Sequence, residues 1–370
     1  MIYHFFRGNT FHLSPKIIED LLYLMEKKTA PEQQRHFFCI MTFSTKYQYK
    51  TPENPYEKIF KKYHVKRHDY IDSFMELLRF ISKANSNDDK FIFHGTIQPY
   101  KLQLVLYIYL LLFNKKKLSQ LILICWGAGD FQIKPSSYIN KIAAFVNNAA
   151  INRMDCSYTL SSEDLKLFQT IHPKAKSKSI RYPIKLHATK PQRVSPPLRS
   201  MVSHSGWPDN KHIDTFNALD RFKDMGIEII CPLCYGDNDY IETVIKTGES
   251  KFGDKFSYFT EIIPTEKYDE LIASMHIFIT ATSIQTGLFA LTRSLAYGVK
   301  VFAQENLLRS MREYGFLIND FKDIKSLNFD DFSAALPVED HATNIKVLYE
   351  KYLHEPEVTR SWDDLYRGNI

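Results

Sequence analysis

The chain has 370 residues, of which 44% are hydrophobic, 24% charged and 14% aromatic, and its formal net charge is +6. That length exceeds one ordinary α/β core and suits two globular domains. The mild positive charge suits anionic partners such as nucleotides or lipid head groups, but no basic stripe with interleaved aromatics indicates nucleic acid.

The first half of the chain alternates short apolar runs with helical patterns. We expect strands at 1–6, 36–43, 90–94 and 120–126, and helices at 70–84 and 100–113. The longest apolar run, 104–113, is ten residues, against about 20 for a membrane span. No signal peptide is expected at the start of the chain, because residues 1–6 have the pattern of a strand. The alternation predicts a parallel sheet with helices on both faces.

The second half repeats this rhythm after a stretch with the composition of a linker. Residues 185–199 contain three prolines and several basic residues, with little apolar periodicity. We expect strands at 200–204, 227–233, 256–259, 276–280 and 299–303, and helices at 212–223, 240–246, 265–274 and 287–297. The resulting division is a domain at 1–188, a linker at 189–199, a domain at 200–345 and a helical tail at 346–370 that packs back on the first domain. Two Rossmann-like domains facing a central cleft are thus predicted.

Two loops in the second half have the composition of diphosphate sites. Residues 203–212 form a small-residue loop between a strand and a helix, where backbone N–H groups and the helix N-terminus can hold phosphates. The residues expected to bind there are Ser205, Gly206, Asn210 and His212. Residues 280–287 repeat the pattern, and the candidates are Gln285, Thr286 and Gly287. One such loop is ordinary, whereas two in one domain favour a nucleotide diphosphate held between helix ends.

No metal site or other cofactor is expected. Asp237 and Asp239 match a DxD pattern, but Asp239 precedes a helix and Glu242 follows three residues later, which is typical of a capping box. Cys231 and Cys234 form a lone CxxC without the second ligand pair that zinc requires.

Three residues of the first half are candidates for proton transfer from an acceptor hydroxyl. His94 and Asp130 follow predicted strands, and His12 follows the first strand, so all three are expected at the ligand-binding edge. For each of them, a purely structural role is the alternative.

Taken in order, motifs along nearly the whole chain resemble the 4-α-L-fucosyltransferase family. In the first half they are Phe-Ile-Phe-His-Gly at 91–95 with Pro99, Trp-Gly-Ala at 126–128, Ser-Ser-Glu-Asp at 161–164, Ile-His-Pro-Lys at 171–174 and Tyr-Pro at 182–183. In the second half they are Ser205-Gly206, Asn210, His212-Ile213, Pro232 with Tyr235, Gln-Thr-Gly at 285–287, Gly298 and Glu305-Asn306. One difference is that an extra glycine separates the family's Trp-Gly-Ala from Asp130.

The resemblance implies the two-domain GT-B fold, with the acceptor bound by the N-terminal domain and the nucleotide sugar by the C-terminal one. It adds Tyr235, Glu305 and Asn306 to the expected nucleotide-sugar site. It implies a dTDP-linked 4-acetamido-4,6-dideoxyhexose as donor and a polyprenyl-pyrophosphate-linked glycan as acceptor, in synthesis of a surface polysaccharide like enterobacterial common antigen. The expected location is the cytoplasmic face of the bacterial inner membrane, as a peripheral protein.

Several alternatives remain open at this stage. If the reaction inverts configuration, one residue of the first domain must act as base, and His94 is the preferred candidate; a retaining reaction needs no dedicated base. An epimerase or hydrolase of the same fold, or a non-catalytic nucleotide-sugar-binding partner, would also fit the loops. Membrane association is expected through Lys61-Lys62, Lys66-Arg67 and the lysines at 115–117 that follow the run 104–113. The alternative is that 104–113 is a buried core helix.

Overall fold

The computed structural model describes residues 1–8, 14–43, 54–84, 86–133, 137–186, 193, 196–282 and 286–368. The chain divides into two compact units: unit 1 comprises Met1–Lys185 and Glu355–Ile370, and unit 2 comprises Leu186–His354. Most of the predicted linker at 189–199 lies outside the described residues. The predicted tail at 346–370 is split, because its first part belongs to unit 2 and the part from Glu355 onward to unit 1.

Unit 1 is built on a seven-stranded sheet in the order β3-β2-β1-β4-β5-β6-β7, in which every described pair is parallel. The strands are β1 (Ile2–Arg7), β2 (His36–Met41), β3 (His68–Ile71), β4 (Lys90–His94), β5 (Leu121–Cys125), β6 (Cys156–Thr159) and β7 (Ser177–Ser179). The central strands are apolar on both sides, as parallel strands covered by helices on both faces must be.

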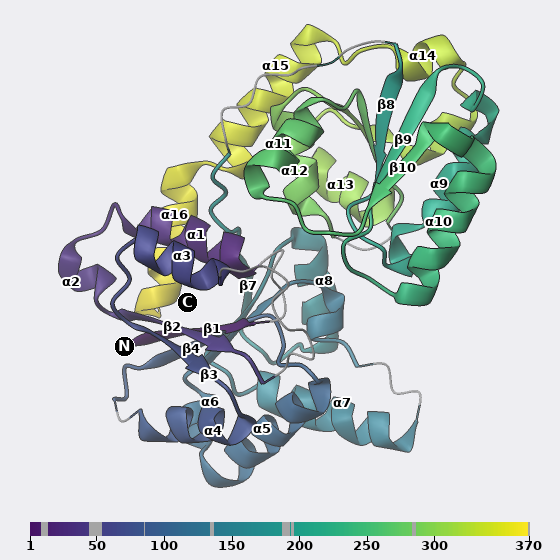
Figure 1. Cartoon of the computed structure of the whole chain (residues 1–370). Helices are drawn as coiled ribbons and strands as arrows, with labels where there is room; N and C mark the ends of the chain where they lie inside the picture. The colour runs from purple at the N-terminus through teal and green to yellow at the C-terminus, as the bar shows by residue number, and fades with distance from the viewer. Residues whose placement is uncertain are drawn as a thin grey trace. The chain divides into compact units, whose positions relative to one another are not determined.

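Helices cover both faces of this sheet (Figure 1). One face carries α1 (Ser14–Met25), α3 (Pro55–Lys62) and α16 (Glu355–Arg367). The other carries α4 (Phe74–Lys83), α5 (Tyr100–Phe113), α7 (Tyr138–Ile151) and α8 (Ser162–Ile171). The short segments are α2 (Ala30–Gln33), α6 (Lys115–Leu118) and a 3-10 turn, η1 (Ala128–Asp130). None of the helices described here has the length and apolar character to cross a bilayer.

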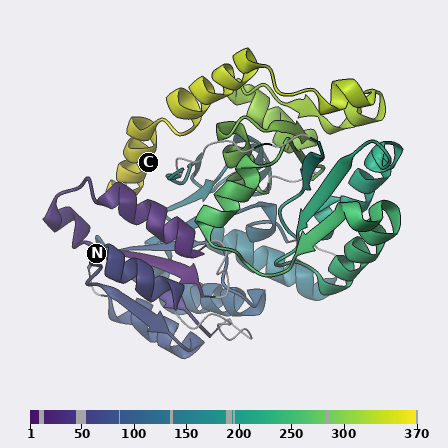
Figure 2. The same cartoon turned by 45° about the horizontal axis from the view of Figure 1, so that its top comes forward.

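The C-terminal helix α16 is an integral part of unit 1. In both views the yellow C-terminal helix lies beside the purple N-terminal segment (Figures 1 and 2). Trp362 is fully buried on the sheet, and its indole Nε1 donates to the carbonyl oxygen of Arg181 at 2.9 Å. Lys28 Nζ pairs with Asp363 at 2.6 Å. The end of the chain therefore completes the core of the unit in which the chain begins.

Unit 2 repeats the same strand order in a six-stranded parallel sheet, β10-β9-β8-β11-β12-β13. The strands are β8 (Leu198–Val202), β9 (Ile227–Pro232), β10 (Phe256–Phe259), β11 (Ile277–Thr280), β12 (Lys300–Ala303) and β13 (Asn319–Asp320). In both units the strand order reverses beside the first strand. Open sheets of this kind bind ligands outside the carboxyl ends of the strands at that reversal, which here means β1/β4 and β8/β11.

The helices of unit 2 also lie on both faces of the sheet (Figure 1). One face carries α9 (His212–Leu219), α10 (Asn238–Phe252) and α14 (Phe329–Ser333), and the other α11 (Thr265–Ala273), α12 (Leu288–Ala296), α13 (Glu305–Tyr314) and α15 (Val338–Val347). The 3-10 turns are η2 (Pro208–Asn210), η3 (Asp220–Phe222), η4 (Gly253–Lys255) and η5 (Phe321–Lys325), and η6 (Leu348–Tyr352) is a π-helical segment.

Several predicted bounds differ from the structure: the strand expected at 200–204 is β8, and the helix expected at 240–246 is the longer α10. The helix expected at 70–84 is a strand followed by a helix, β3 and α4, because His68–Ile71 pairs with β2. Ser73 ends the strand and caps α4 by accepting a hydrogen bond from Glu76 N at 3.1 Å. The helix expected at 212–223 ends at Leu219 and continues as a 3-10 turn.

Candidate functional site

The carboxyl edge of the unit 2 sheet carries backbone strain. Three non-glycine residues near this edge have positive φ: Ser203 at 61°, Lys211 at 50° and Glu305 at 49°. Ser203 directly follows β8, and Glu305 lies two residues after β12. Such conformations cost on the order of 1–3 kcal/mol each and concentrate at functional sites. The strain thus marks this edge independently of any sequence motif.

His204 stands beside the start of α12. Its Nε2 lies 3.1 Å from Thr286 Oγ1, across from β8 to the loop after β11. Gly287 has a φ of 73°, and a Cβ at this position would lie 2.6 Å from His204 Nδ1. Burial lowers the pKa of His204 to about 4, so the imidazole is neutral at neutral pH. Gly287 is therefore required both by the backbone turn and by the space that His204 fills.

Gly206 has a different role from the one expected. Its N–H donates to the carbonyl oxygen of Tyr235 at 2.7 Å, and its carbonyl oxygen accepts from Asp237 N at 3.1 Å. A Cβ on Gly206 would lie 2.2 Å from a side-chain carbon of Ile241. The glycine allows two loops to pack together and its N–H is already used, while its place in the nucleotide-sugar site stays a prediction.

Ser205, Asn210 and His212 are all buried and support the loop from within. Asn210 Nδ2 donates to the carbonyl oxygen of Ser205 at 2.6 Å and to Ser205 Oγ at 2.9 Å. The backbone N–H of His212 donates to the Tyr240 hydroxyl at 3.0 Å, and burial lowers the pKa of its enclosed imidazole to about 3. Asn210 thus holds the loop at Ser205, whereas neither imidazole nitrogen of His212 has a hydrogen-bond partner among the described residues. Binding of the nucleotide sugar by these three residues stays a prediction.

Lys211 is the residue that this loop presents. Its Nζ lies 3.5 Å from Glu305 Oε1, and the two side chains are 29% and 41% exposed. Gln304 Nε2 also donates to Glu305 Oε1, at 2.7 Å. Lys211 was not among the predicted site residues, although it is the only lysine or arginine in 203–212. That single positive charge was the available signal, since a nearby cation forms a strong, charge-assisted contact with a phosphate.

Two helix N-termini of unit 2, those of α12 and α13, begin near these residues without a side-chain cap from the cap residue. The start of α9 differs, because the N–H of its first residue, His212, donates to the Tyr240 hydroxyl. In contrast, α10 is capped by Asp237, whose Oδ1 accepts from Tyr240 N at 2.9 Å. The cap is thus Asp237 and not Asp239 as expected, and the helix starts at Asn238. Uncapped first-turn N–H groups and the helix dipole attract an anion.

The other predicted nucleotide-binding residues lie around the same edge. Thr286 contacts His204 as described, and Asn306 Oδ1 accepts from Arg309 Nη2 at 3.0 Å in the first turn of α13. Tyr235 lies in the loop after β9, and burial raises the pKa of its hydroxyl. Gln285 lies outside the described residues. Within the part of the chain that is described, no group of three or more His, Cys, Asp and Glu side chains is arranged to hold a metal ion.

At the corresponding edge of unit 1, Asp130 joins the ends of β4 and β5. Its Oδ1 accepts from Thr96 Oγ1 at 2.8 Å, and its Oδ2 accepts from Trp126 N at 2.6 Å. Arg7, the last residue of β1, lies with its guanidinium carbon 4.8 Å from the centre of the Trp126 ring. Burial lowers the pKa of Arg7, and Asp130 partly offsets this effect. Both carboxylate oxygens of Asp130 are therefore engaged in holding the loop, and its role as a base stays a prediction.

His94 belongs to a buried chain of hydrogen-bonded rings. Its Nε2 lies 3.0 Å from His4 Nδ1, and His4 Nε2 lies 2.9 Å from His36 Nδ1. On the other side, His94 Nδ1 lies 2.7 Å from the Tyr182 hydroxyl, which also accepts from Trp126 Nε1 at 3.1 Å. We call His4, His36 and His94 the histidine chain. Burial is the main cause that lowers the pKa of each, in His36 to about 3.

The surroundings of His94 do not favour the catalytic role expected for it. The imidazole is fully buried, stacks on Phe6 with ring centres 4.0 Å apart and lies under Trp362 of α16. Both ring nitrogens are already paired within the protein, so no nitrogen faces an acceptor hydroxyl in this geometry. His12, the third predicted proton acceptor, lies outside the described residues.

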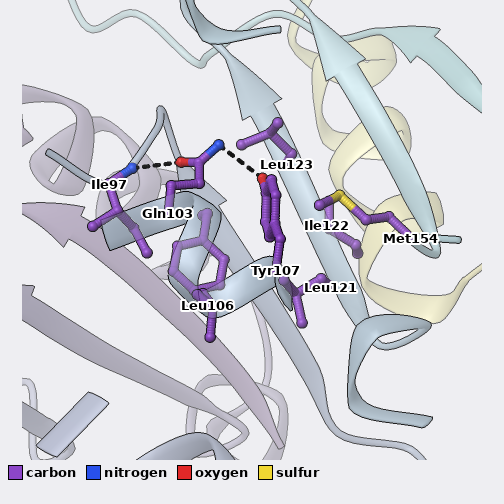
Figure 3. Close-up of a pocket in the computed structure, with 9 residues that line it drawn as sticks. Ile97, Gln103, Leu106, Tyr107, Leu121, Ile122, Leu123 and Met154 are labelled. Carbon is purple, nitrogen blue, oxygen red and sulfur yellow. Dashed lines mark hydrogen bonds between the residues drawn. The ribbon is translucent and has the colours of Figure 1, made fainter. Parts of the chain in front are cut away.

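A small cavity under α5 is too confined for a ligand. It measures about 10 Å³ and is lined by apolar side chains of β4, β5 and α5 around Gln103 (Figure 3). Gln103 Oε1 accepts from Ile97 N at 2.8 Å, and its Nε2 donates to the Tyr107 hydroxyl at 2.8 Å. A volume of this size holds at most one water molecule. The cavity is thus a packing gap on the buried side of α5.

Solved structures with the same two-unit architecture cover almost the whole chain. Anabaena HepE, crystallised with UDP and glucose, superimposes with a TM-score of 0.65 at 10% identity over 98% of each chain. A glycosyltransferase from Rickettsia africae gives 0.64 at 12% identity over 99% of this chain and 97% of that one. The N-terminal domain of trehalose-6-phosphate phosphatase from Candida albicans gives 0.66 at 9% identity over 100% and 97%. The fold is that of the GT-B glycosyltransferases.

A sequence-family model identifies the family within this class of enzymes. Residues 23–312 match the family described as "4-alpha-L-fucosyltransferase glycosyl transferase group 56". The chain belongs to this family and is a nucleotide-sugar glycosyltransferase of the fucosyltransferase-like type.

Proposed function

We propose that unit 2 binds a dTDP-linked 4-acetamido-4,6-dideoxyhexose, and that the enzyme transfers this sugar to a polyprenyl-pyrophosphate-linked glycan at the cytoplasmic face of a bacterial inner membrane. The family supports a nucleotide-sugar donor, and HepE has been crystallised with UDP and with UDP-glucose. One observation carries the assignment of the donor to unit 2. Lys211 and the N-termini of α12 and α13, which have no side-chain cap from the cap residue, lie near a strained strand edge at the reversal of the strand order.

This edge suits the charge that the reaction develops. An acceptor hydroxyl oxygen forms a bond to the anomeric carbon, the bond from that carbon to the phosphate oxygen breaks, and the nucleoside diphosphate leaves with the electron pair. The departing phosphate gains negative charge, which Lys211 and the first-turn N–H groups of α12 and α13 are positioned to stabilise. Glu305 orients Lys211 by the contact at 3.5 Å. The hydroxyl proton passes to a base or to solvent.

His204 is proposed to contact the donor as a neutral imidazole. Its lowered pKa keeps it uncharged at neutral pH, so it can give or accept one hydrogen bond without repelling or attracting phosphate strongly. Thr286 fixes one ring nitrogen by its contact with Nε2. The ring is thereby held at the start of α12, where the sugar diphosphate is proposed to lie.

The test is a calorimetric titration of the full-length protein with dTDP, UDP and GDP, followed by a turnover assay. We expect dTDP to bind most tightly, and a dTDP-amino sugar to be consumed only when a polyprenyl-pyrophosphate glycan is present. Consumption without an acceptor would indicate the hydrolase or epimerase alternative. Binding without any turnover would indicate a non-catalytic partner, and the absence of binding to all three nucleotides would refute the donor site.

A further inference from the structure

An unusual concentration of exposed apolar side chains lies on two neighbouring helices of unit 1. Eight of the seventeen exposed large apolar residues among those described lie on α5 and α7, which contact each other. We call them the α5–α7 face: Val105, Ile108, Leu112, Phe113, Tyr138, Ile139, Ile142 and Phe145. Soluble monomers rarely expose large contiguous apolar patches, and such patches mark interaction sites.

The outward direction of this face is fixed by the packing on its inner side. On α5, Gln103, Leu106, Tyr107 and Leu110 are buried against the sheet, with Gln103 hydrogen-bonded as Figure 3 shows. The residues at 101, 105, 108 and 112 recur with helical spacing and form the opposite stripe, which is exposed. Helix α5 is therefore not the fully buried core helix that the sequence left as the alternative to membrane association.

The charges on the helices that form this face are of one sign. Helices α5, α6 and α7 contain no aspartate or glutamate and five lysines. Lys117 is buried with its Nζ 5.3 Å from the centre of the Phe91 ring, which leaves four exposed: Lys101, Lys115, Lys116 and Lys141. Aromatic and aliphatic side chains bordered by exposed lysines are the composition of surfaces that lie on anionic bilayers. A second copy of the chain would fit poorly, because like charges would face each other.

We propose that the α5–α7 face binds an anionic lipid bilayer and holds the enzyme where a lipid-linked acceptor is presented. The proposal rests on the lipid-linked acceptor proposed above. It also revises the surface expected from the sequence, because Lys62 pairs with Glu19 and α3 lies on the opposite face of the sheet. The exposed lysines contribute long-range attraction, and the apolar side chains enter the region between head groups and acyl chains.

The test is flotation of full-length protein with vesicles of phosphatidylcholine alone and of phosphatidylcholine mixed with phosphatidylglycerol. We expect binding to the anionic vesicles only. The double variant Phe113→Ser/Phe145→Ser should bind the anionic vesicles at least about tenfold more weakly than the wild type. The reason is that each exposed aromatic ring adds apolar area to the bilayer contact. The variant Lys115→Glu/Lys116→Glu should lose binding most at low salt.

Two control variants test whether vesicle binding depends on the α5–α7 face or on any exposed apolar or positively charged side chains. Val338→Ser/Tyr349→Ser removes exposed apolar side chains from unit 2, and Lys58→Glu/Lys61→Glu reverses charges on α3. Both control variants should bind vesicles like the wild type. All four variants should unfold at the wild-type temperature, since the replaced side chains are exposed.

Three further outcomes would refute either the membrane surface or the proposed function, and each distinguishes between the two. Wild-type protein that ignores anionic vesicles while binding dTDP would refute the membrane surface and leave the donor site intact. Vesicle binding without nucleotide binding would refute the proposed function alone. A wild-type dimer in solution that Phe113→Ser/Phe145→Ser converts to a monomer would show that a second copy covers the face.

Discussion

The replacement of Gly287 by alanine tests the donor site through a single methyl group. Gly287 has a φ of 73°, in the left-handed region, where an L-residue with a Cβ costs about 1–2 kcal/mol relative to glycine. The new Cβ would also lie 2.6 Å from His204 Nδ1, a distance that real contacts essentially never reach. The imidazole must therefore move away, which breaks its contact with Thr286 at a cost of about 1 kcal/mol.

Gly226 provides a control with the same backbone conformation. Its φ is 74°, and a Cβ there would meet no atom within 4 Å. Gly226→Ala should therefore lower the free energy of unfolding by the backbone term alone, about 1–2 kcal/mol. Gly287→Ala should lower it by about 2–3 kcal/mol, since the displacement of His204 is added.

Donor affinity gives the second readout. If the diphosphate lies at the start of α12, Gly287→Ala should weaken dTDP binding about tenfold, because His204 moves into the space the ligand uses. Gly226→Ala should leave the affinity unchanged. Urea unfolding and calorimetric titration measure both quantities on the same samples. Equal destabilisation by the two variants, or wild-type dTDP affinity in Gly287→Ala, would refute this account of the glycine.

Two further predictions concern charge. Lys211→Met should lower kcat/KM by about 100-fold, because it removes the charge-assisted contact proposed for the leaving phosphate. Lys246→Met, at an exposed position of α10, should leave kcat/KM unchanged. Equal kinetics for the two variants would contradict the proposed role of Lys211. The histidine chain should make the protein acid-sensitive, because burial lowers the pKa of each imidazole in the folded state. Its stability contribution is therefore present above the ordinary pKa of 6.5 and is lost as the pH falls below it, for His36 toward about 3. Urea midpoints measured as the pH is lowered below 6.5 should fall less steeply for His36→Phe than for the wild type, and equal slopes would contradict this prediction.

Local sequence patterns predict the bounds of a strand or helix correctly where the local preference and the tertiary packing agree. The strand at 90–94 and the helix at 100–113 were predicted with the bounds of β4 and α5. The helix at 70–84 was wrong in its first residues because Tyr70 and Ile71 continue the helical period, while pairing with β2 decides their state. Ser73 and Glu76 were the available capping signal for the true start of α4.

The candidate site was predicted at the level of loops and not at the level of atoms. The loops after β8 and β11 were identified, and the two strands are hydrogen-bonded neighbours. Which side chains stay accessible depends on α10, whose Tyr240 and Ile241 close over His212 and Gly206. Positive φ at Lys211 was also unreadable from the sequence, because neither glycine nor asparagine occupies that position.

The two units use one strand order for edges of different chemistry. In unit 1 the carboxylate of Asp130 satisfies the backbone N–H of Trp126 and the hydroxyl of Thr96, so the edge is closed by its own side chains. In unit 2, α12 and α13 begin without a side-chain cap from the cap residue. The first-turn N–H groups of a helix need a partner such as water or an anion when no side chain caps them. This difference is the reason for expecting the diphosphate of the proposed donor at the edge of unit 2 and not at that of unit 1.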